Sequence, residues 1–382
     1  MPASKKKSCG QCALCEFIHL SYADQLRIKQ KEFELLMREA GGAVLPFLPS
    51  PRKSRFRNKL QLPLKMGGDR LRMGFYKPGT HEIMDFRDCP VQDKRLTRAA
   101  LLVKRVLEKY PLSIYNEDRH TGLLRTLFLR SASQSDLIHV ALVATKTEGQ
   151  GIRELARRLQ SEFRRQGLRL SGLTLNINPD RTNVILGERE TVLSGKAKLR
   201  ERILGLDFHA ATRSFLQTNP GVTEKMYQKA MEWLAPEARE SGLDLFCGMG
   251  TLTLVLARRV KGMAGVDASS SAIQDAGENA RCNGVKNARF FCRDLDRDSL
   301  EDLPAADFAV LDPPRQGCSE ALLKYLVRQR IKRVVYISCN PMTLKRDLLL
   351  LREGGFGIRK IQPVDMFPYT RHVESMTLLA WP

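Results

Sequence analysis

Cys339 is a candidate nucleophile because of the polar run in which it lies. It stands in Ser338–Pro341 (Ser-Cys-Asn-Pro), directly after an apolar stretch that predicts a strand. A second polar run, Asp312–Arg315 (Asp-Pro-Pro-Arg), follows the preceding predicted strand. A thiolate attacks carbon only where its sulfur is accessible in an electropositive setting. From these residues alone two interpretations stay open, a nucleophile or a buried, inert thiol.

A glycine-rich turn predicts a binding loop for an adenosine ligand. Asp244–Gly250 (Asp-Leu-Phe-Cys-Gly-Met-Gly) is an apolar strand that opens into the turn, and a helix is predicted at Leu252–Arg259. Glycine lets the backbone approach a ligand closely, and a helix N-terminus favours polar or anionic groups. Asp267 ends the next predicted strand, about 20 residues after the glycines, where an acid can bond ribose hydroxyls. The alternative is a tight turn without a ligand, and the missing third glycine argues against a nicotinamide dinucleotide.

Four cysteines near the N-terminus form a candidate metal site. Cys9, Cys12 and Cys15 are separated by two residues each, and Cys89 follows much later, directly before a proline. Zinc sites usually show two separated pairs of ligands, whereas three close thiolates and a distant Cys-Pro suit a [4Fe–4S] cluster. We expect an iron–sulfur cluster on these four residues, with a zinc ion or unligated thiols as the alternatives.

The positive charge of the chain lies mostly in its first 220 residues. The net charge is +21 over 382 residues. Residues 1–220 carry 40 basic and 22 acidic side chains, whereas residues 221–382 carry 23 and 20. Such an excess indicates a polyanionic partner, either nucleic acid or an anionic membrane surface. We expect the first part to hold that partner and the second part to do chemistry.

From residue 220 onward, predicted strands alternate with helical stretches such as Ser270–Asn283 and Thr343–Glu353. This alternation indicates an α/β fold with a doubly wound, Rossmann-like parallel sheet, and two final stretches predict an antiparallel terminal hairpin. The predicted strands here are Leu243–Cys247, Gly262–Val266, Ala288–Cys292, Phe308–Leu311, Val334–Ser338, Ile358–Val364 and Ser375–Trp381.

The preceding part predicts a mixed α+β domain. A helix is expected at Ala23–Ala40, before a break at Pro46, and another at Gly151–Gln166. The predicted strands are Leu60–Leu64, Arg70–Tyr76, Leu123–Ser131, Leu137–Thr145, Leu173–Asn178 and Asn183–Gly187.

Five ordered motifs between residues 214 and 382 resemble the RNA (uracil-5-)-methyltransferases. They are Ser214–Pro220 (Ser-Phe-Leu-Gln-Thr-Asn-Pro), Asp244–Gly250, Asp312–Arg315, Ser338–Pro341 and His372–Leu379 (His-Val-Glu-Ser-Met-Thr-Leu-Leu). The resemblance implies that S-adenosylmethionine donates a methyl group to C5 of a uridine in RNA.

The resemblance also implies a role for individual residues. Cys339 is expected to attack C6 of the uracil, and Glu374 to remove the C5 proton as general base; without the resemblance, Glu374 would be taken for a surface carboxylate at a strand end. Gln217, Phe246, Asp267 and Asp312 are expected to contact the methyl donor, and Asp294 to reach its adenine. Many members of the family carry an iron–sulfur cluster, which matches the interpretation of Cys9, Cys12, Cys15 and Cys89. In those members the first two cysteines are usually separated by more residues than Cys9 and Cys12 are.

The expected organisation has three parts. Residues 1–51 form an iron–sulfur segment with a helix, with its fourth ligand at Cys89; residues 52–213 form a basic RNA-binding domain; and residues 214–382 form the methyltransferase domain. Within the family, the combination of a cluster with no appended N-terminal RNA-binding barrel most resembles the RlmC (RumB) type, which acts on 23S ribosomal RNA. Transfer RNA, at its conserved uridine loop, is the alternative substrate.

Partners and location complete the expectations. No stretch approaches the roughly 18–20 consecutive apolar residues of a membrane span, and no apolar region follows the basic N-terminus as in a signal peptide. We therefore expect a cytoplasmic monomer with RNA, rather than a membrane, as its partner. From a different class, the rival hypothesis is a non-catalytic RNA-binding iron–sulfur protein, against which Cys339 and Glu374 argue.

Overall fold

The strands predicted after residue 220 form one mixed sheet in the computed structural model, which describes residues 14–110, 112–147 and 150–382. The chain folds into two compact units. The first comprises the described part of Met1–His19 together with Ser54–Arg202 and His209–Arg213. The second comprises Leu20–Lys53, Ile203–Phe208 and Ser214–Pro382.

The sheet of the second unit has eight strands in the order β1-β16-β17-β15-β14-β11-β12-β13. Strands β15, β14, β11, β12 and β13 are parallel, and β17 runs antiparallel to both β15 and β16. The predicted α/β sheet with an antiparallel hairpin is thus confirmed. The strands are β1 (Ala43–Val44), β11 (Ser241–Leu245), β12 (Gly262–Asp267), β13 (Ala288–Cys292), β14 (Phe308–Leu311), β15 (Arg333–Ser338), β16 (Gly357–Val364) and β17 (Glu374–Ala380).

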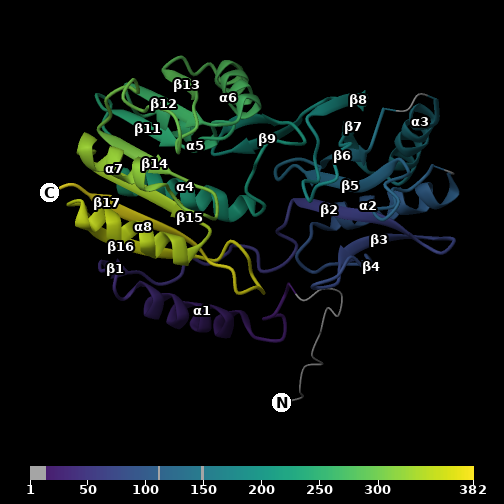
Figure 1. Ribbon diagram of the computed structural model, residues 1–382, viewed down its shortest axis with the longest axis horizontal. Coiled ribbons are helices and arrows are strands. Elements are labelled where there is room, and N and C mark those ends of the chain that lie inside the picture. Colours follow the sequence, from purple (N-terminus) through teal and green to yellow (C-terminus); the bar gives the residue numbers. More distant parts are fainter. Residues whose placement is uncertain (1–13, 111, 148–149) are drawn as a thin grey trace. The chain divides into compact units, whose positions relative to one another are not determined.

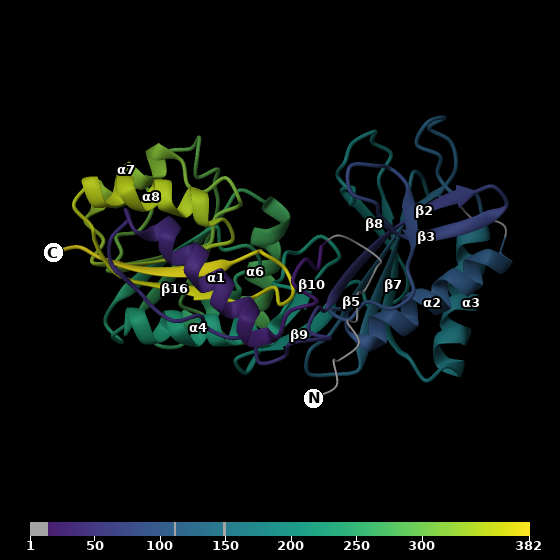
Figure 2. The same ribbon diagram turned by 90° about the horizontal axis from the view of Figure 1, so that it is seen from below.

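Helices cover both faces of this sheet. Figure 2 shows α7 and α8 on one side of the yellow strands β16 and β17 and α4 on the other. Because both faces are covered, the central strands are continuous apolar runs; β14 is buried at every position. The helices are α1 (Tyr22–Met37), α4 (Pro220–Leu234), α5 (Thr251–Ala257), α6 (Ser270–Cys282), α7 (Glu320–Gln329) and α8 (Pro341–Glu353).

The N-terminal helix and strand pack on the second unit. Phe33 and Met37 of α1 enter the same core as Leu348 and Phe356, and β1 pairs in parallel with β16. This apolar packing assigns Leu20–Lys53 to the second unit. The expected division, which kept this helix in a separate segment of residues 1–51, therefore differs from the packing of the chain.

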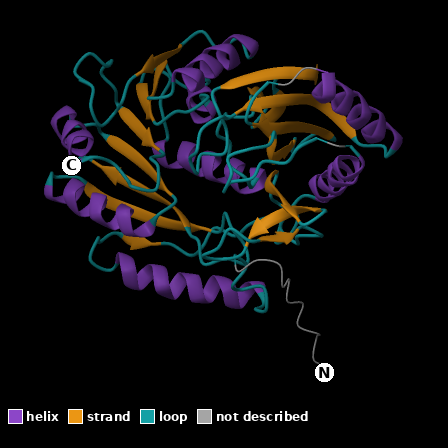
Figure 3. Ribbon diagram, turned by 45° about the vertical axis from the view of Figure 1, so that its right-hand side comes forward, coloured by secondary structure: helices purple, strands orange, loops and turns teal. Residues whose placement is uncertain are grey.

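The first unit is a seven-stranded sheet in the order β4-β3-β2-β5-β6-β7-β8. All its neighbouring pairs are antiparallel except β6 and β7, which α3 connects. Helices α2 and α3 lie side by side on it (Figures 1 and 3). The strands are β2 (Lys59–Gly67), β3 (Arg70–Tyr76), β4 (Ile83–Asp85), β5 (Leu124–Ser131), β6 (Leu137–Ala144), β7 (Arg169–Ile177) and β8 (Arg189–Gly195), and the helices are α2 (Lys94–Lys109) and α3 (Gln150–Arg165). A separate two-stranded sheet pairs β9 (Leu199–Ile203) with β10 (Leu206–Ala210).

The strand predicted at Asn183–Gly187 is wrong, because this segment is a loop before β8. Two asparagine side chains replace the neighbouring strand as hydrogen-bond partners. Asn176 bonds both the N–H and the carbonyl of Gly187, at 2.8 and 3.0 Å. Asn178 donates to the carbonyl oxygens of Val184 and Ile185 at 2.6 and 3.0 Å. Because these side chains satisfy the backbone N–H and carbonyl groups, the loop does not need hydrogen bonds to a neighbouring strand.

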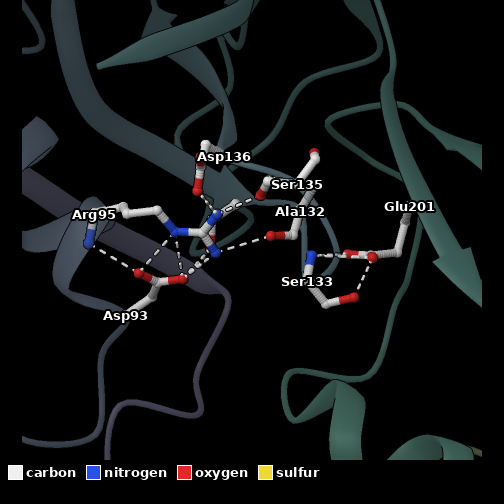
Figure 4. Close-up of polar contacts among 8 residues, drawn as sticks. Asp93, Arg95, Ala132, Ser133, Ser135, Asp136 and Glu201 are labelled. Atoms are coloured by element: carbon white, nitrogen blue, oxygen red, sulfur yellow. Dashed lines mark hydrogen bonds and ion pairs between the residues drawn. The ribbon is translucent and has the colours of Figure 1, made fainter. Parts of the chain in front are cut away.

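Buried polar contacts hold the turn between β5 and β6 from two sides (Figure 4). Arg95 bonds both carboxylate oxygens of Asp93 at 3.1 and 3.0 Å, and it donates to the carbonyl of Ala132 at 2.8 Å. Glu201 of β9 accepts the backbone N–H of Ser133 at 3.0 Å. Arg95 with Asp93 and Glu201 with Ser133 therefore fix this turn.

Among the described residues, no helix combines the length and the apolar character that a membrane crossing requires.

Candidate active site

The glycine-rich turn after β11 is open where a ligand would lie. Phe246, Gly248 and Gly250 all have a positive φ, of 69°, 53° and 81°. A Cβ atom added at Gly248 would meet nothing within 4 Å, whereas one at Gly250 would lie 3.1 Å from the ring of Phe290. Gly250 thus allows close packing inside the unit, and Gly248 leaves space beside the turn.

Asp267 fixes this turn from the end of β12. Its Oδ2 accepts the N–H of Gly248 at 2.9 Å, and its Oδ1 accepts the N–H of Ser269, the residue that caps α6, at 2.8 Å. A carboxylate has further lone pairs beyond these two bonds. Asp267 can therefore hold the turn and still accept hydrogen bonds from ribose hydroxyls, as the sequence predicts.

Two further acids lie at the carboxyl ends of the central strands. Asp244 accepts a hydrogen bond from Thr253, and burial raises the pKa of Asp244 to about 7. Burial likewise raises the pKa of Asp312 to about 7, although a hydrogen bond from Gln217 lowers it. Both acids therefore change charge near neutral pH.

Cys339 and Glu374 are the neighbours in sequence of two residues that pair between adjacent strands. In the antiparallel register of β15 and β17, Ser338 lies opposite Ser375, and the Ser375 hydroxyl donates to the Ser338 carbonyl at 3.3 Å. The next residue of β15 and the preceding residue of β17 are Cys339 and Glu374. The pairing of two distant segments thus brings the predicted nucleophile and the predicted base together.

The electrostatics of this pair are unusual. Burial, followed by the charges of Glu374 and Asp312, raises the pKa of the Cys339 thiol to about 11, while Arg315 lowers it. Burial and then the charge of Asp312 raise the pKa of Glu374 well above its ordinary value. Glu374 is 1% exposed, and its Oε1 has no hydrogen-bond partner among the described residues. An unpaired buried carboxylate of this kind is typical of a proton acceptor.

The two polar runs of the site are tied together. The amide of Asn340 donates to the carbonyl of Arg315 at 2.8 Å, and the Thr343 hydroxyl donates to the same oxygen at 3.2 Å. Asn340 also caps α8, since its Oδ1 accepts the N–H of Met342 at 3.2 Å. These bonds hold the loop that carries Cys339.

The remaining predicted residues are placed as follows. Asp294 is half-buried after β13, where it accepts the N–H of Asp296 at 3.0 Å and lies 3.7 Å from Arg297. Cys15 and Cys89 are both buried in the first unit. Cys9 and Cys12 lie outside the described residues. Within the described ranges, no three His, Cys, Asp or Glu side chains are grouped as a metal site.

A buried ion pair next to the site was not predicted from the sequence. Lys29 of α1 lies 2.7 Å from Asp365, which directly follows β16, and their side chains are 0% and 1% exposed. A signal was present, because Gln25, Lys29, Phe33 and Met37 recur every four residues and all are buried. Two polar residues on an otherwise core-facing stripe indicate a specific partner in the core.

These residues fit S-adenosylmethionine. The turn at Gly248 offers open space, Asp267 offers acceptors for ribose, and Asp312 offers negative charge near a positively charged sulfur. When bound, the donor would supply a methyl group on that sulfur. Gln217, Phe246, Asp267 and Asp312 are the residues that would hold it.

The chain is similar to known RNA methyltransferases. Residues 21–381 match the family model described as tRNA (Uracil-5-)-methyltransferase. The chain is 36% identical to an uncharacterized RNA methyltransferase of Bacillus cereus over 389 residues, which cover 99% of this chain and 84% of the relative. An uncharacterized RNA methyltransferase of Listeria monocytogenes is also 36% identical, over 99% of this chain and 83% of its own length.

A solved structure extends the comparison. The tRNA (uracil-54, C5)-methyltransferase of Pyrococcus abyssi, in complex with S-adenosyl-L-homocysteine, superposes with a TM-score of 0.78 at 28% identity, over 96% of this chain and 85% of that one. The chain therefore belongs to the RNA (uracil-5-)-methyltransferase family and is an S-adenosylmethionine-dependent enzyme that methylates C5 of uracil in RNA.

Proposed function

We propose that methyl transfer proceeds through a covalent adduct between Cys339 and the uracil, and that Glu374 resolves it. The observation that supports this proposal is the β15–β17 register, in which Ser338, the residue before Cys339, pairs with Ser375, the residue after Glu374. C5 of uracil is a weak nucleophile, so attack by a thiolate must first activate the ring.

The steps conserve atoms and electrons as follows. The Cys339 thiol loses its proton to solvent, its sulfur bonds to C6, and the electrons of the C5–C6 double bond move into an enolate. C5 of the enolate takes the methyl group, and the electrons of the donor's carbon–sulfur bond leave with its sulfur. Glu374 then removes the C5 proton, the C5–C6 double bond forms again, and the bond from C6 to Cys339 breaks. Once Glu374 is ionised, its burial and the absence of a partner for its Oε1 among the described residues make this carboxylate a strong acceptor for the C5 proton.

Replacement of the nucleophile tests this proposal. Cys339→Ala should abolish methylation of unmodified RNA and any protein–RNA adduct, because the ring is no longer activated. Cys282→Ala, at an exposed helical cysteine, is the matched control. Methyl transfer that persists in Cys339→Ala would show that the nucleophile is wrongly assigned.

We propose 23S ribosomal RNA as the substrate and transfer RNA as the second candidate. The four-cysteine pattern supports ribosomal RNA by its resemblance to the RlmC (RumB) type. The similarity to a tRNA (uracil-54, C5)-methyltransferase supports transfer RNA. The purified enzyme should be offered both RNAs from a strain that lacks its gene, and mapping of 5-methyluridine then identifies the substrate.

We also propose that Cys9, Cys12, Cys15 and Cys89 hold a [4Fe–4S] cluster. Support comes from their spacing and from the burial of Cys15 and Cys89 in the same unit. Protein purified without oxygen should be brown and contain about four irons per chain. Colourless protein that contains zinc would overturn the assignment.

A further inference from the structure

The loop between β16 and β17 ends at Glu374 and is anchored by a lysine from α1. Lys29 Nζ lies 2.7 Å from Asp365 Oδ1, and it donates to the carbonyl oxygens of Phe367 and His372, both at 3.2 Å. An ammonium group carries three protons, so Lys29 uses all of them on this loop. The last contact lies two residues before Glu374.

Two neighbours hold the same loop. Gln25, one turn before Lys29, accepts the backbone N–H of Tyr369 at 2.9 Å. Asn219 donates to the carbonyl of Met366 at 3.1 Å. The loop is thus tied to α1 and to the segment that contains Gln217, a predicted ligand of the methyl donor.

Stability alone does not explain a fully buried ion pair here. Apolar side chains of similar shape usually stabilise a core at least as well as such a pair, and the same face of α1 buries Phe33 and Met37. Unlike an apolar side chain, the Lys29 ammonium group fixes the shape of the loop backbone through its hydrogen bonds. We propose that Lys29 is a positioning residue that sets the geometry of Glu374 for removal of the C5 proton. This inference rests on the proposed role of Glu374.

The test separates adduct formation from adduct release. Lys29→Met keeps the length of the side chain but loses the three hydrogen bonds. With unmethylated RNA and S-adenosylmethionine, it should form the adduct near the normal rate and release it about 10- to 100-fold more slowly, since small misplacement of a reacting group has effects of this size. Lys31→Met, at an exposed position of the same helix, should behave like the wild type.

The outcomes distinguish the possible failures. Equal slowing of adduct formation and release, or an unchanged release rate, would overturn the role of Lys29. If Lys29→Met does not fold, the double variant Lys29→Met/Asp365→Asn, which buries no unpaired charge, should fold and still release the adduct slowly; normal release would overturn the proposal. If Glu374→Gln also fails to accumulate an adduct, the proposed function itself is wrong.

A cavity in the first unit supports a second, independent inference. Its volume is about 340 Å³, and its walls include Tyr76, His81, Tyr115 and the loop residues Val184 and Ile185. Val184 and Ile185 are exposed, by 63% and 38%. Aromatic and exposed apolar side chains on the same cavity wall are suited to contact with a planar group.

Polar groups at the edge of this cavity are held in place. Glu117 accepts from the Tyr76 hydroxyl at 3.2 Å and contacts His81 Nδ1 at 3.1 Å. Arg125 stacks on Tyr115, with its guanidinium carbon 4.7 Å from the ring centroid, and donates to the carbonyl of Asn178 at 2.9 Å.

We propose that this cavity takes one unpaired nucleobase of the RNA. Aromatic faces and an arginine are the groups on which single-stranded bases stack, and Lys65 and Arg125 on the wall match the charge of the flanking phosphates. The inference rests on RNA being the substrate.

Binding of a ten-residue uridine RNA, compared with the same backbone without bases, tests this proposal. Tyr76→Ala should weaken uridine binding about 5- to 100-fold, the range for one lost stacked base, and leave the abasic RNA unchanged. Tyr110→Ala, in the same unit but outside this cavity, is the control. Equal effects on both RNAs, or none, would overturn the proposal. If Tyr76→Ala does not fold, Val184→Ser should show the same selective loss, and binding of the uridine RNA at wild-type strength by Val184→Ser would overturn the proposal.

Discussion

Two buried carboxylates of the first unit and the buried Glu374 of the second unit have neighbours of opposite charge. In the first unit, burial raises the pKa of Glu190 and Glu201, and the positive charge of Arg130 opposes that rise for both. Arg130 is itself buried, which lowers its pKa to about 10. In the second unit, burial raises the pKa of Glu374, and the neighbour that acts on it, Asp312, raises it further.

This difference separates structure from chemistry. A cation beside a buried acid favours the charged form of that acid and opposes the effect of burial, so the pair serves the fold. A buried acid beside another acid has its pKa raised both by burial and by repulsion, so it holds a proton more firmly than an exposed carboxyl group does. The three predictions that follow would break or sharpen this distinction.

Glu374→Gln should have the largest effect. Without a proton acceptor, turnover should fall about 10²- to 10⁴-fold, the range for loss of a general base, while binding of S-adenosylmethionine stays normal. Glu353→Gln, at the exposed end of α8, is the control for a neutralised carboxylate. Turnover within a factor of three of the wild type would remove the distinction between the two kinds of buried acid.

Arg130→Met should act on stability instead. It leaves Glu190 and Glu201 buried without their cation, and breaking a buried pair in this way costs about 3–5 kcal/mol of unfolding free energy. Urea denaturation of the full chain measures this loss, and Arg105→Met, on the exposed face of α2, is the comparison. A loss below about 1 kcal/mol would contradict the structural role of Arg130.

Asp312→Asn should change how donor binding depends on pH. Because the pKa of Asp312 is raised to about 7, raising the pH through 7 adds negative charge near the positively charged sulfur. S-adenosylmethionine should therefore bind more tightly at pH 8 than at pH 6, and a one-unit lowering of this pKa on binding corresponds to about tenfold in affinity.

The variant should lose this pH dependence, whereas Asp307→Asn, at a surface acid paired with Lys332, should keep it. S-adenosylhomocysteine, whose sulfur carries no charge, should bind the wild type with a weaker dependence on pH than S-adenosylmethionine does. Calorimetric titrations at pH 6 and pH 8 measure the affinity for each of the two ligands. An unchanged pH dependence in Asp312→Asn would place the donor away from this acid.

Local patterns in the sequence predict much of the second unit. The apolar strands, the turn at Asp244–Gly250 and the motifs around Cys339 and Glu374 are all continuous in the chain. What they do not contain is the pairing of β17 between β15 and β16, which brings Glu374 to Cys339. Strand order depends on contacts between distant segments, so no local pattern encodes it.

Two other features escaped sequence reasoning for related reasons. α1 was expected in a separate segment because the prolines from Pro46 onward mark a break after it, whereas Lys29 of this helix pairs with Asp365, far along the chain. Asn183–Gly187 has the composition of a strand, but side chains of Asn176 and Asn178 satisfy its backbone. In both cases a polar side chain with a distant or unusual partner overrode the expected pattern.

The central claim is that Cys339 bonds to the uracil and Glu374 releases it. The most direct measurement is peptide mass spectrometry of Glu374→Gln after incubation with unmethylated RNA and S-adenosylmethionine, followed by nuclease and protease digestion. We predict a peptide in which Cys339 carries a methylated uridine nucleotide, and its absence from the Cys339→Ala/Glu374→Gln double variant. Absence of the adduct, or its presence on another residue, would contradict the claim.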